Sequence, residues 1–161
     1  MLTLTWPVQT EDRKALKEPF TDSFYRTAVW DGTKWVYYHF HYVRCPDGRY
    51  RYVHGGNDLH GPRGSHLVAC YPGKIVWVNE GLAFGNHQFK IVDAFGREYH
   101  YKHTLSRPAN GIHVSAGTRV ALLGDEGTSA AHLHFEIRSH NDKNAVINPR
   151  QYLLAAESRA A

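Results

Sequence analysis

The chain has 161 residues, of which 42% are hydrophobic and 21% are charged, so it can bury a core of its own and belongs to neither the disordered nor the collagen-like classes. Its formal net charge of +4 is scattered, without a run of five like charges, which argues against a nucleic-acid partner. The informative excess is twelve histidines, because imidazole is the commonest metal ligand in proteins.

The first third of the chain predicts one short helix followed by strands. Residues 10–18 have a helical composition, and after them β-branched and aromatic residues come in short runs separated by Gly, Asn and Pro. Asp31 and Gly32 suit a two-residue hairpin turn. We therefore expect residues 1–51 to form an N-terminal segment with an added β-hairpin. The strands of a three-stranded meander are expected at 25–30, 33–44 and 49–54, so that the last strand continues beyond this segment.

The rest of the chain also predicts short strands bounded by turn residues, which is typical of an antiparallel, β-rich domain. The C-terminal residues 147–161 predict a short helix that begins near Pro149. We therefore expect a mainly β fold with an antiparallel sheet and minor short helices, in a single domain over residues 1–161. The further strands are expected within residues 65–71, 74–80, 86–95, 97–105, 118–124 and 131–139.

Two histidines, His132 and His134, stand two residues apart in a predicted strand, with Leu133 and Phe135 at the alternate positions. Side chains two apart in a strand share a face at roughly 6.6 to 7 Å, so both imidazoles should point to one side while the apolar pair faces the core. Such a pair can supply one metal ligand and one catalytic group, although an isolated HxH is only moderately specific.

The sequence HGGND at residues 54–58 is a second cluster, with His54 and Asp58 on one side of the chain. Fully extended geometry would hold these two residues about 13 Å apart, so the chain must bend for both to reach one ion. Gly55 and Gly56 permit a bend because glycine accepts positive φ, and the missing side chain of Gly56 would leave room for a metal. Taken alone, the segment also suits an ordinary loop.

Together the two clusters supply two imidazoles and one carboxylate, from His54, Asp58 and His134. This is the ligand set of a catalytic zinc site with an open fourth position, which suits amide hydrolysis. No HExxH glutamate is present to act as a base, so His132 and His103 are the candidates for proton transfer and oxyanion stabilisation. For His103 the sequence alone favours an ordinary strand histidine.

Residues 52–150 resemble the M23 family of lysostaphin-type peptidases. HGGND is similar to the family's HxGxD motif, REYHYKHTLS to its Tyr-x-His-Leu-Ser strand, and the run ending in HLHFE to its closing segment. The resemblance implies an antiparallel β-sheet groove and a zinc-dependent endopeptidase that hydrolyses peptide bonds in peptidoglycan stems or cross-bridges. By position, the implied zinc ligands are His54, Asp58 and His134, and the implied catalytic histidines are His103 and His132.

The same resemblance implies peptides of bacterial peptidoglycan as partners and action on the cell wall, at its extracellular or periplasmic face. We expect no nucleic-acid partner, no membrane insertion and a monomer. The sequence shows neither a signal peptide nor a wall-binding domain. This favours an antibacterial endolysin of phage origin, a virion-associated enzyme or a trimmed catalytic domain.

Two departures from the family pattern bear on substrate specificity. The Phe-Gly-x-Arg stretch ahead of the first motif is present only as residues 23–26, and Thr104 is an additional residue between His103 and Leu105. A second HxH pair, His39 and His41, lies in an aromatic-rich strand, where we expect it to line the substrate wall rather than to bind metal.

Three questions stay open at this point. A cupin-type metal enzyme also carries HxH on a strand but wants a glutamate about four residues after the second histidine, whereas Glu136 follows His134 by two. A non-catalytic, zinc-containing module that binds the cell wall is the other alternative. Cys45 and Cys70 are expected to be free thiols, with one disulfide between them as the alternative.

Overall fold

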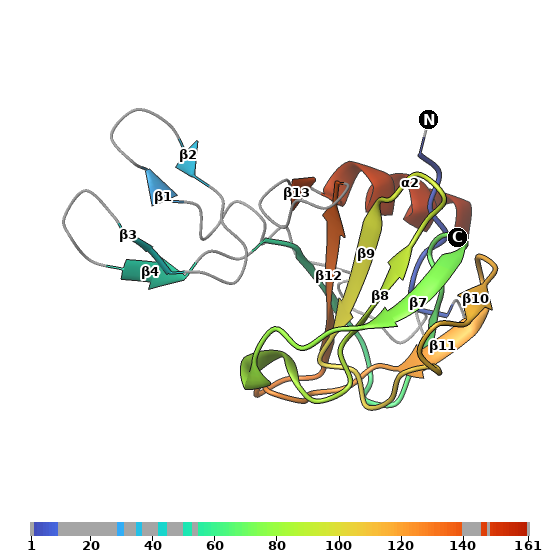
Figure 1. The fold of residues 1–161 in the computed structure, drawn as a ribbon, viewed down its shortest axis with the longest axis horizontal. Coiled ribbons are helices and arrows are strands. Elements are labelled where there is room, and N and C mark those ends of the chain that lie inside the picture. Colours follow the sequence, from blue (N-terminus) through green and yellow to red (C-terminus); the bar gives the residue numbers. More distant parts are fainter. Residues whose placement is uncertain are drawn as a thin grey trace.

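A seven-stranded antiparallel sheet dominates the fold (Figure 1). The structure is a computed structural model that describes residues 2–9, 29–30, 35–36, 42–44, 50–52, 55–139, 146–147 and 149–160. The strand order is β10-β7-β8-β9-β12-β13, and β5 also pairs with β12. These strands are β5 (Asn57–His60), β7 (Gly73–Trp77), β8 (Phe89–Val92), β9 (Glu98–Lys102), β10 (His113–Val114), β12 (His132–Arg138) and β13 (Val146–Ile147). The mainly β, antiparallel architecture predicted from the sequence is confirmed.

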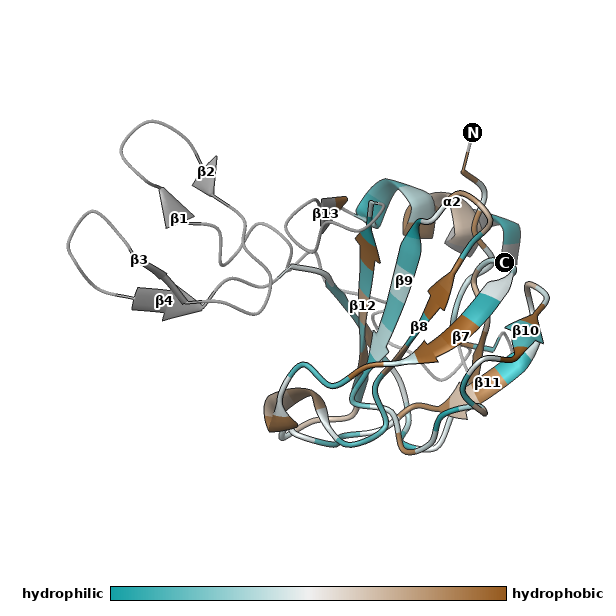
Figure 2. Ribbon diagram, in the orientation of Figure 1, coloured by the Kyte–Doolittle hydropathy of each residue, from teal (hydrophilic) through white to brown (hydrophobic). Residues whose placement is uncertain are grey.

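The two faces of this sheet differ in chemistry. Along β12 the side chains of Leu133, Phe135 and Ile137 are fully buried in the core, as the alternation predicts. The intervening positions are polar, and the same holds for β9, where Tyr99 and Tyr101 enter the core. Figure 2 draws β9 as hydrophilic along its length although it is an inner strand. One face of the sheet therefore builds the core and the other carries charge.

The apolar face is covered by three further pieces of chain. A two-stranded sheet pairs β6 (His66–Val68) with β11 (Arg119–Leu122), and Val8 of the N-terminal segment forms a bridge to Leu67. The helix α2 (Arg150–Ala160) begins after Pro149, as predicted, and adds Leu153 to the core. A 3-10 turn, η1 (Leu82–Phe84), follows β7. Among the described residues no helix is both long and apolar enough to span a bilayer.

Where the three-stranded meander was expected, the described strands form two antiparallel pairs, and residues 37–41 lie outside the described residues. β1 (Val29–Trp30) pairs with β2 (Trp35–Val36), and β3 (Tyr42–Arg44) pairs with β4 (Tyr50–Tyr52). Trp30 is opposite Trp35. The turn predicted at Asp31-Gly32 lies outside the described residues. The predicted helix at 10–18 lies outside the described residues, as do residues 23–26, His39, His41 and Cys45.

Candidate metal centre

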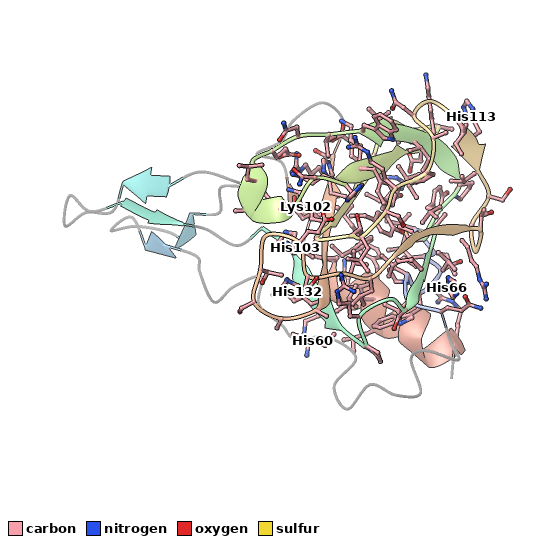
Figure 3. The ribbon with its side chains drawn as sticks, turned by 90° about the horizontal axis from the view of Figure 1, so that it is seen from below. His60, His66, Lys102, His103, His113 and His132 are labelled. Carbon is pink, nitrogen blue, oxygen red and sulfur yellow. The ribbon has the colours of Figure 1, made fainter. Side chains whose placement is uncertain are left out.

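The polar face carries a cluster of histidines around one carboxylate, where β5 pairs with β12. Asp58 is the cross-strand partner of His134, and its Oδ1 lies 3.3 Å from His134 Nδ1. The same oxygen lies 3.6 Å from Nε2 of His132. The ring of His103 is centred 4.6 Å from that of His132 and 6.1 Å from that of His134. Four of the five predicted site residues therefore converge, and Figure 3 shows His103 beside His132.

The fifth predicted residue, His54, lies outside the described residues. Within the part of the chain that the structure describes, no group of three His, Cys, Asp or Glu side chains could hold a metal. The predicted site needs His54 as its third ligand, so the described residues test only the pair Asp58 and His134.

The ring of His134 is oriented by a second carboxylate behind it. Its Nε2 lies 2.6 Å from Oε1 of Glu136, and both side chains are buried. An ionised carboxylate only accepts hydrogen bonds, so Nε2 carries the proton and a neutral ring turns its lone pair, on Nδ1, toward Asp58. Two acceptors then face each other, which calls for a proton or a metal cation between them.

The residues present fit zinc in this respect. Two ligand atoms that each lie about 2.1 Å from a tetrahedral zinc ion are roughly 3.4 Å apart, close to the separation of Asp58 Oδ1 and His134 Nδ1. Although burial opposes protonation of His134, its hydrogen bonds with Asp58 and Glu136 raise its pKa above the usual value. The pair thus attracts positive charge in the absence of a metal.

The other two histidines are oriented in the opposite sense. Nδ1 of His103 lies 2.6 Å from the carbonyl oxygen of Glu126, and Nδ1 of His132 lies 2.8 Å from that of Ala130. A carbonyl oxygen only accepts, so each Nδ1 donates and each neutral ring keeps its lone pair on Nε2. His103 and His132 can therefore accept a proton at Nε2, whereas His134 offers Nδ1.

Burial keeps these two rings neutral. It lowers the pKa of His103 to about 4, against an opposing effect of the hydrogen bond to Glu126. Burial also lowers the pKa of His132, although the nearby carboxylate of Asp58 opposes this shift. At neutral pH both rings are bases with an available lone pair.

The backbone of His103 is held in an unusual conformation. Its φ is 65°, a left-handed value, and among the described residues it is the only non-glycine with positive φ. Its amide donates to the carbonyl oxygen of Phe84, and its own carbonyl oxygen would lie 2.5 Å from a Cβ added at Gly124. The additional residue Thr104 is buried and donates from its hydroxyl to the carbonyl oxygen of His87. The extra residue thus anchors the turn that follows His103.

The structure corrects the role expected for Gly56. A Cβ at this position would lie 2.4 Å from the carbonyl oxygen of Phe135 and 2.8 Å from Cγ of Glu136. Gly56 is not among the described glycines with positive φ, so it is not selected for a left-handed bend. Its missing side chain makes room for β12 rather than for a metal, because β5 and β12 pack closely there. Asp58 itself lies within β5 and not in the loop that the segment, taken alone, also suited.

Sequence reasoning missed several charged groups that surround the site. Lys102, Glu136 and Arg138 are almost fully buried on the polar face, although such residues normally predict exposure. Burial lowers the pKa of Lys102 to about 8, while Glu136 and Glu80 oppose the shift. Residues 98–102 alternate between charged or polar and aromatic side chains, and this alternation predicts a strand. It does not show that the charged side chains of the strand are buried.

Of the two cysteines, the structure describes only Cys70. Cys70 is a buried, free thiol. Burial raises its pKa to about 12. Its backbone amide donates a hydrogen bond to the hydroxyl of Tyr101 at 2.9 Å. The expectation of a free thiol is confirmed for Cys70.

Comparison with known proteins places these residues within a family. The sequence model of peptidase family M23 matches residues 52–149, which include all five predicted site residues. The murein hydrolase activator NlpD of Salmonella dublin is 34% identical over 108 residues, covering 62% of this chain and 26% of the relative. The chain thus spans about a quarter of the length of that curated relative.

Solved structures agree with the fold. A variant of the catalytic domain of the prophage-encoded M23 protein EnpA from Enterococcus faecalis has a TM-score of 0.55 and 28% identity, covering 79% of this chain and 98% of that one. The antimicrobial peptidase lysostaphin from Staphylococcus simulans has a TM-score of 0.56 and 27% identity, covering 75% of this chain and 50% of that one. The match to this family leaves no support for the cupin alternative.

Proposed function

Because the chain belongs to peptidase family M23, we propose that it is a zinc-dependent endopeptidase that hydrolyses peptide bonds in the stems or cross-bridges of bacterial peptidoglycan. One observation carries the proposal: Asp58 Oδ1 and His134 Nδ1 face each other at 3.3 Å. Two neutral-ring histidines beside them keep their lone pairs on Nε2. A cation between Asp58 Oδ1 and His134 Nδ1 and proton-transferring groups beside it suit metal-assisted amide hydrolysis.

In this proposal Asp58, His134 and His54 hold the zinc ion, which supplies Lewis acidity toward the scissile carbonyl when bound. His103 and His132 act through Nε2. One accepts a proton from the attacking water at Nε2. The other stabilises the developing oxyanion, for which its Nε2 must first gain a proton, because a lone pair there would repel the negative charge. The carbonyl oxygens of Glu126 and Ala130 keep each Nδ1 protonated, so neither ring can turn its lone pair away without losing that hydrogen bond.

We assign this activity to residues 52–150 within one domain over residues 1–161, with residues 1–51 as the added N-terminal part. The proposed partners are peptidoglycan peptides at the extracellular or periplasmic face of the cell wall, and the proposed setting is antibacterial wall lysis by an endolysin. The EnpA and lysostaphin matches support it, since one is prophage-encoded and the other an antimicrobial peptidase. We expect a monomer.

A second candidate function is that of a non-catalytic module that binds the cell wall or activates another hydrolase. It is favoured by one finding, the 34% identity to a protein named as a murein hydrolase activator. Such a module can contain zinc but needs no proton-transferring histidines. The two candidates therefore predict different results for a mutation of His103. A peptidase should lose its activity, whereas a binding or activating module should keep its function.

The test uses purified protein, its zinc content and mass spectrometry of fragments released from sacculi. We expect about one zinc per chain and new peptide ends in the digest. His134→Ala should lose zinc and release, whereas His103→Ala should keep zinc but lose release. His66→Ala is the matched control, because His66 lies on β6 away from the cluster (Figure 3). Protein that releases no fragments but stimulates a second hydrolase, with or without bound zinc, would refute the peptidase and support the activator.

A further inference from the structure

We infer that Glu136 is a positioning residue of the proposed zinc site: clamped by Lys102 and Arg138, it fixes the ring state in which His134 turns Nδ1 toward the metal. The inference rests on the proposed function, because it concerns a proposed zinc ligand. It goes beyond that function by giving a role to three buried charges that lie outside the metal and catalytic sets.

The clamp occupies both oxygens of the Glu136 carboxylate. Oε1 lies 2.6 Å from His134 Nε2 and 3.4 Å from Lys102 Nζ. Oε2 accepts from Nε of Arg138 at 3.0 Å. Glu136 is 1% exposed, Lys102 0% and Arg138 3%, so water does not compete for these bonds.

The two cations are themselves fixed in place. Lys102 is the cross-strand partner of His134, and its Nζ lies 4.1 Å from the centre of the Phe84 ring and 3.8 Å from Glu80 Oε2. Arg138 Nη2 lies 2.9 Å from the same Glu80 oxygen. Glu80 therefore bridges the two cations, so neither can withdraw from Glu136 without breaking a second contact.

The chemistry of the clamp settles which way the His134 hydrogen bond runs. Lysine and arginine side chains only donate hydrogen bonds, so they stabilise Glu136 as an ionised acceptor. An acceptor at this position takes its proton from His134 Nε2. Without that constraint the neutral ring could protonate Nδ1 instead, and Nδ1–H cannot bind a metal.

Glu136→Gln tests this logic because it changes one atom and keeps the shape. If the amide oxygen faces Arg138, the amide NH2 faces His134 and Lys102 and donates to the ring, which inverts the tautomer. If the oxygen faces His134 instead, the NH2 faces the donor Nε of Arg138. Either outcome weakens the hold on His134. Loss of such an outer hydrogen bond lowers metal affinity by about 10- to 100-fold.

Glu98→Gln is the matched control. Glu98 is also buried on the polar face, where its carboxylate bonds to the Nε2 of His100 at 3.0 Å and to Lys90. It thus repeats the histidine–carboxylate–lysine arrangement of Glu136 at a histidine that is not a proposed ligand. We expect Glu98→Gln to alter stability but to keep the zinc dissociation constant within about twofold.

Two measurements decide the matter. Zinc affinity of each metal-free protein is measured by competition with a chromogenic chelator. The tautomer of His134 is determined by NMR from the chemical shifts of its ring nitrogens in the metal-free wild type. The spectra are recorded at a pH where a titration of the same signals shows that the ring is neutral. We expect an Nε2–H ring in the wild type and zinc binding about 10- to 100-fold weaker in Glu136→Gln.

Several results would overturn the inference. An Nδ1–H ring in the wild type would do so, and so would a folded Glu136→Gln protein that binds zinc as tightly as Glu98→Gln. If Glu136→Gln does not fold, Lys102→Met decides: it removes one donor of the clamp, and unchanged zinc affinity would count against the clamp. If the wild type binds no zinc at all, the proposed function fails, but the tautomer measurement still tests the orienting role of Glu136.

Discussion

Replacing Gly56 by alanine should displace β5 and so weaken the proposed metal site from a distance. The new Cβ would stand 2.4 Å from the carbonyl oxygen of Phe135, whereas ordinary van der Waals contact begins near 3.4 Å. The two strands must therefore separate by about 1 Å locally. Because β12 is also hydrogen-bonded to β9 on its other side, β5 is the strand that moves.

This displacement is large for a ligand that lies two residues away. Zinc–ligand distances hold within about 0.2 Å in functional sites, so a shift of Asp58 by a sizeable part of 1 Å removes it from productive geometry. We expect zinc affinity to fall at least about tenfold. Overpacking of this kind also destabilises the fold, by about 1–3 kcal/mol.

Gly73→Ala separates the two effects. A Cβ at Gly73 would lie 2.4 Å from the carbonyl oxygen of Val92 and 2.8 Å from Cγ2 of Ile91, so the overlap matches that at Gly56. It occurs between β7 and β8, away from Asp58. Urea unfolding of the metal-free proteins should show both variants destabilised, and chelator competition should show weaker zinc binding only in Gly56→Ala. Equal zinc affinities in the two variants, or a Gly56→Ala protein as stable as the wild type, would refute the reasoning.

Three further outcomes follow from the described residues. Asp93→Ala should destabilise the protein by on the order of 3 kcal/mol in urea unfolding, because the Asp93 carboxylate accepts from the Tyr99 hydroxyl, the Arg97 guanidinium and two backbone amides. Burial raises the pKa of the Cys70 thiol to about 12, so at pH 8 it should resist a thiol reagent in the native protein and react once the protein unfolds. The Cys45→Ser variant leaves Cys70 as the one thiol to be measured, and rapid labelling of the native protein would contradict its burial. Burial lowers the pKa of His103 to about 4 in the folded protein. In the unfolded chain the pKa of a histidine is about 6.5, so between pH 4 and pH 6.5 the unfolded state binds more protons than the folded state. The free energy of unfolding of the metal-free protein should therefore rise by up to about 3 kcal/mol from pH 4 to pH 6.5. His103→Gln should flatten that part of the curve, and an unchanged curve would show that another group controls it.

Periodicity predicted the part of the site that lies on one strand. The alternation of His132, Leu133, His134 and Phe135 placed two imidazoles on one face and two apolar side chains in the core, as the structure has them. Such an inference needs no tertiary information, because a strand repeats every two residues. The strands at β6 to β9, β11 and β12 were predicted from short runs of strand-forming residues bounded by turn residues.

Convergence across strands could not be predicted from periodicity. That Asp58 lies opposite His134 depends on β5 pairing with β12, which joins residues 76 positions apart. Only the chemistry of a shared ligand set and the family resemblance indicated it, and the structure brings the pair together. The same limit explains the wrong reason given for Gly56, since the sequence does not reveal that the backbone of β12 passes so close.

The buried charges were missed because residue type argued against them. A strand that reads Glu98, Tyr99, His100, Tyr101, Lys102 suggests one apolar and one solvated face. In the structure its polar face is buried as well. A charge is tolerated there only when opposite charges and hydrogen bonds surround it, and those partners come from β12 and from Glu80, so no local pattern reports them.

The strain at His103 bears on the choice between a peptidase and an activating module. A left-handed conformation at a non-glycine residue raises the free energy of the fold, and it persists only where surrounding contacts enforce it. Here the Phe84 carbonyl, the close approach of Gly124 and the Glu126 carbonyl all act on one residue. A surface that merely binds the cell wall has no need of an imidazole with its lone pair held on Nε2 beside Asp58 and His134. The arrangement is understandable if His103 transfers a proton, which is why His103→Ala, more than loss of zinc, is the variant that separates the two functions.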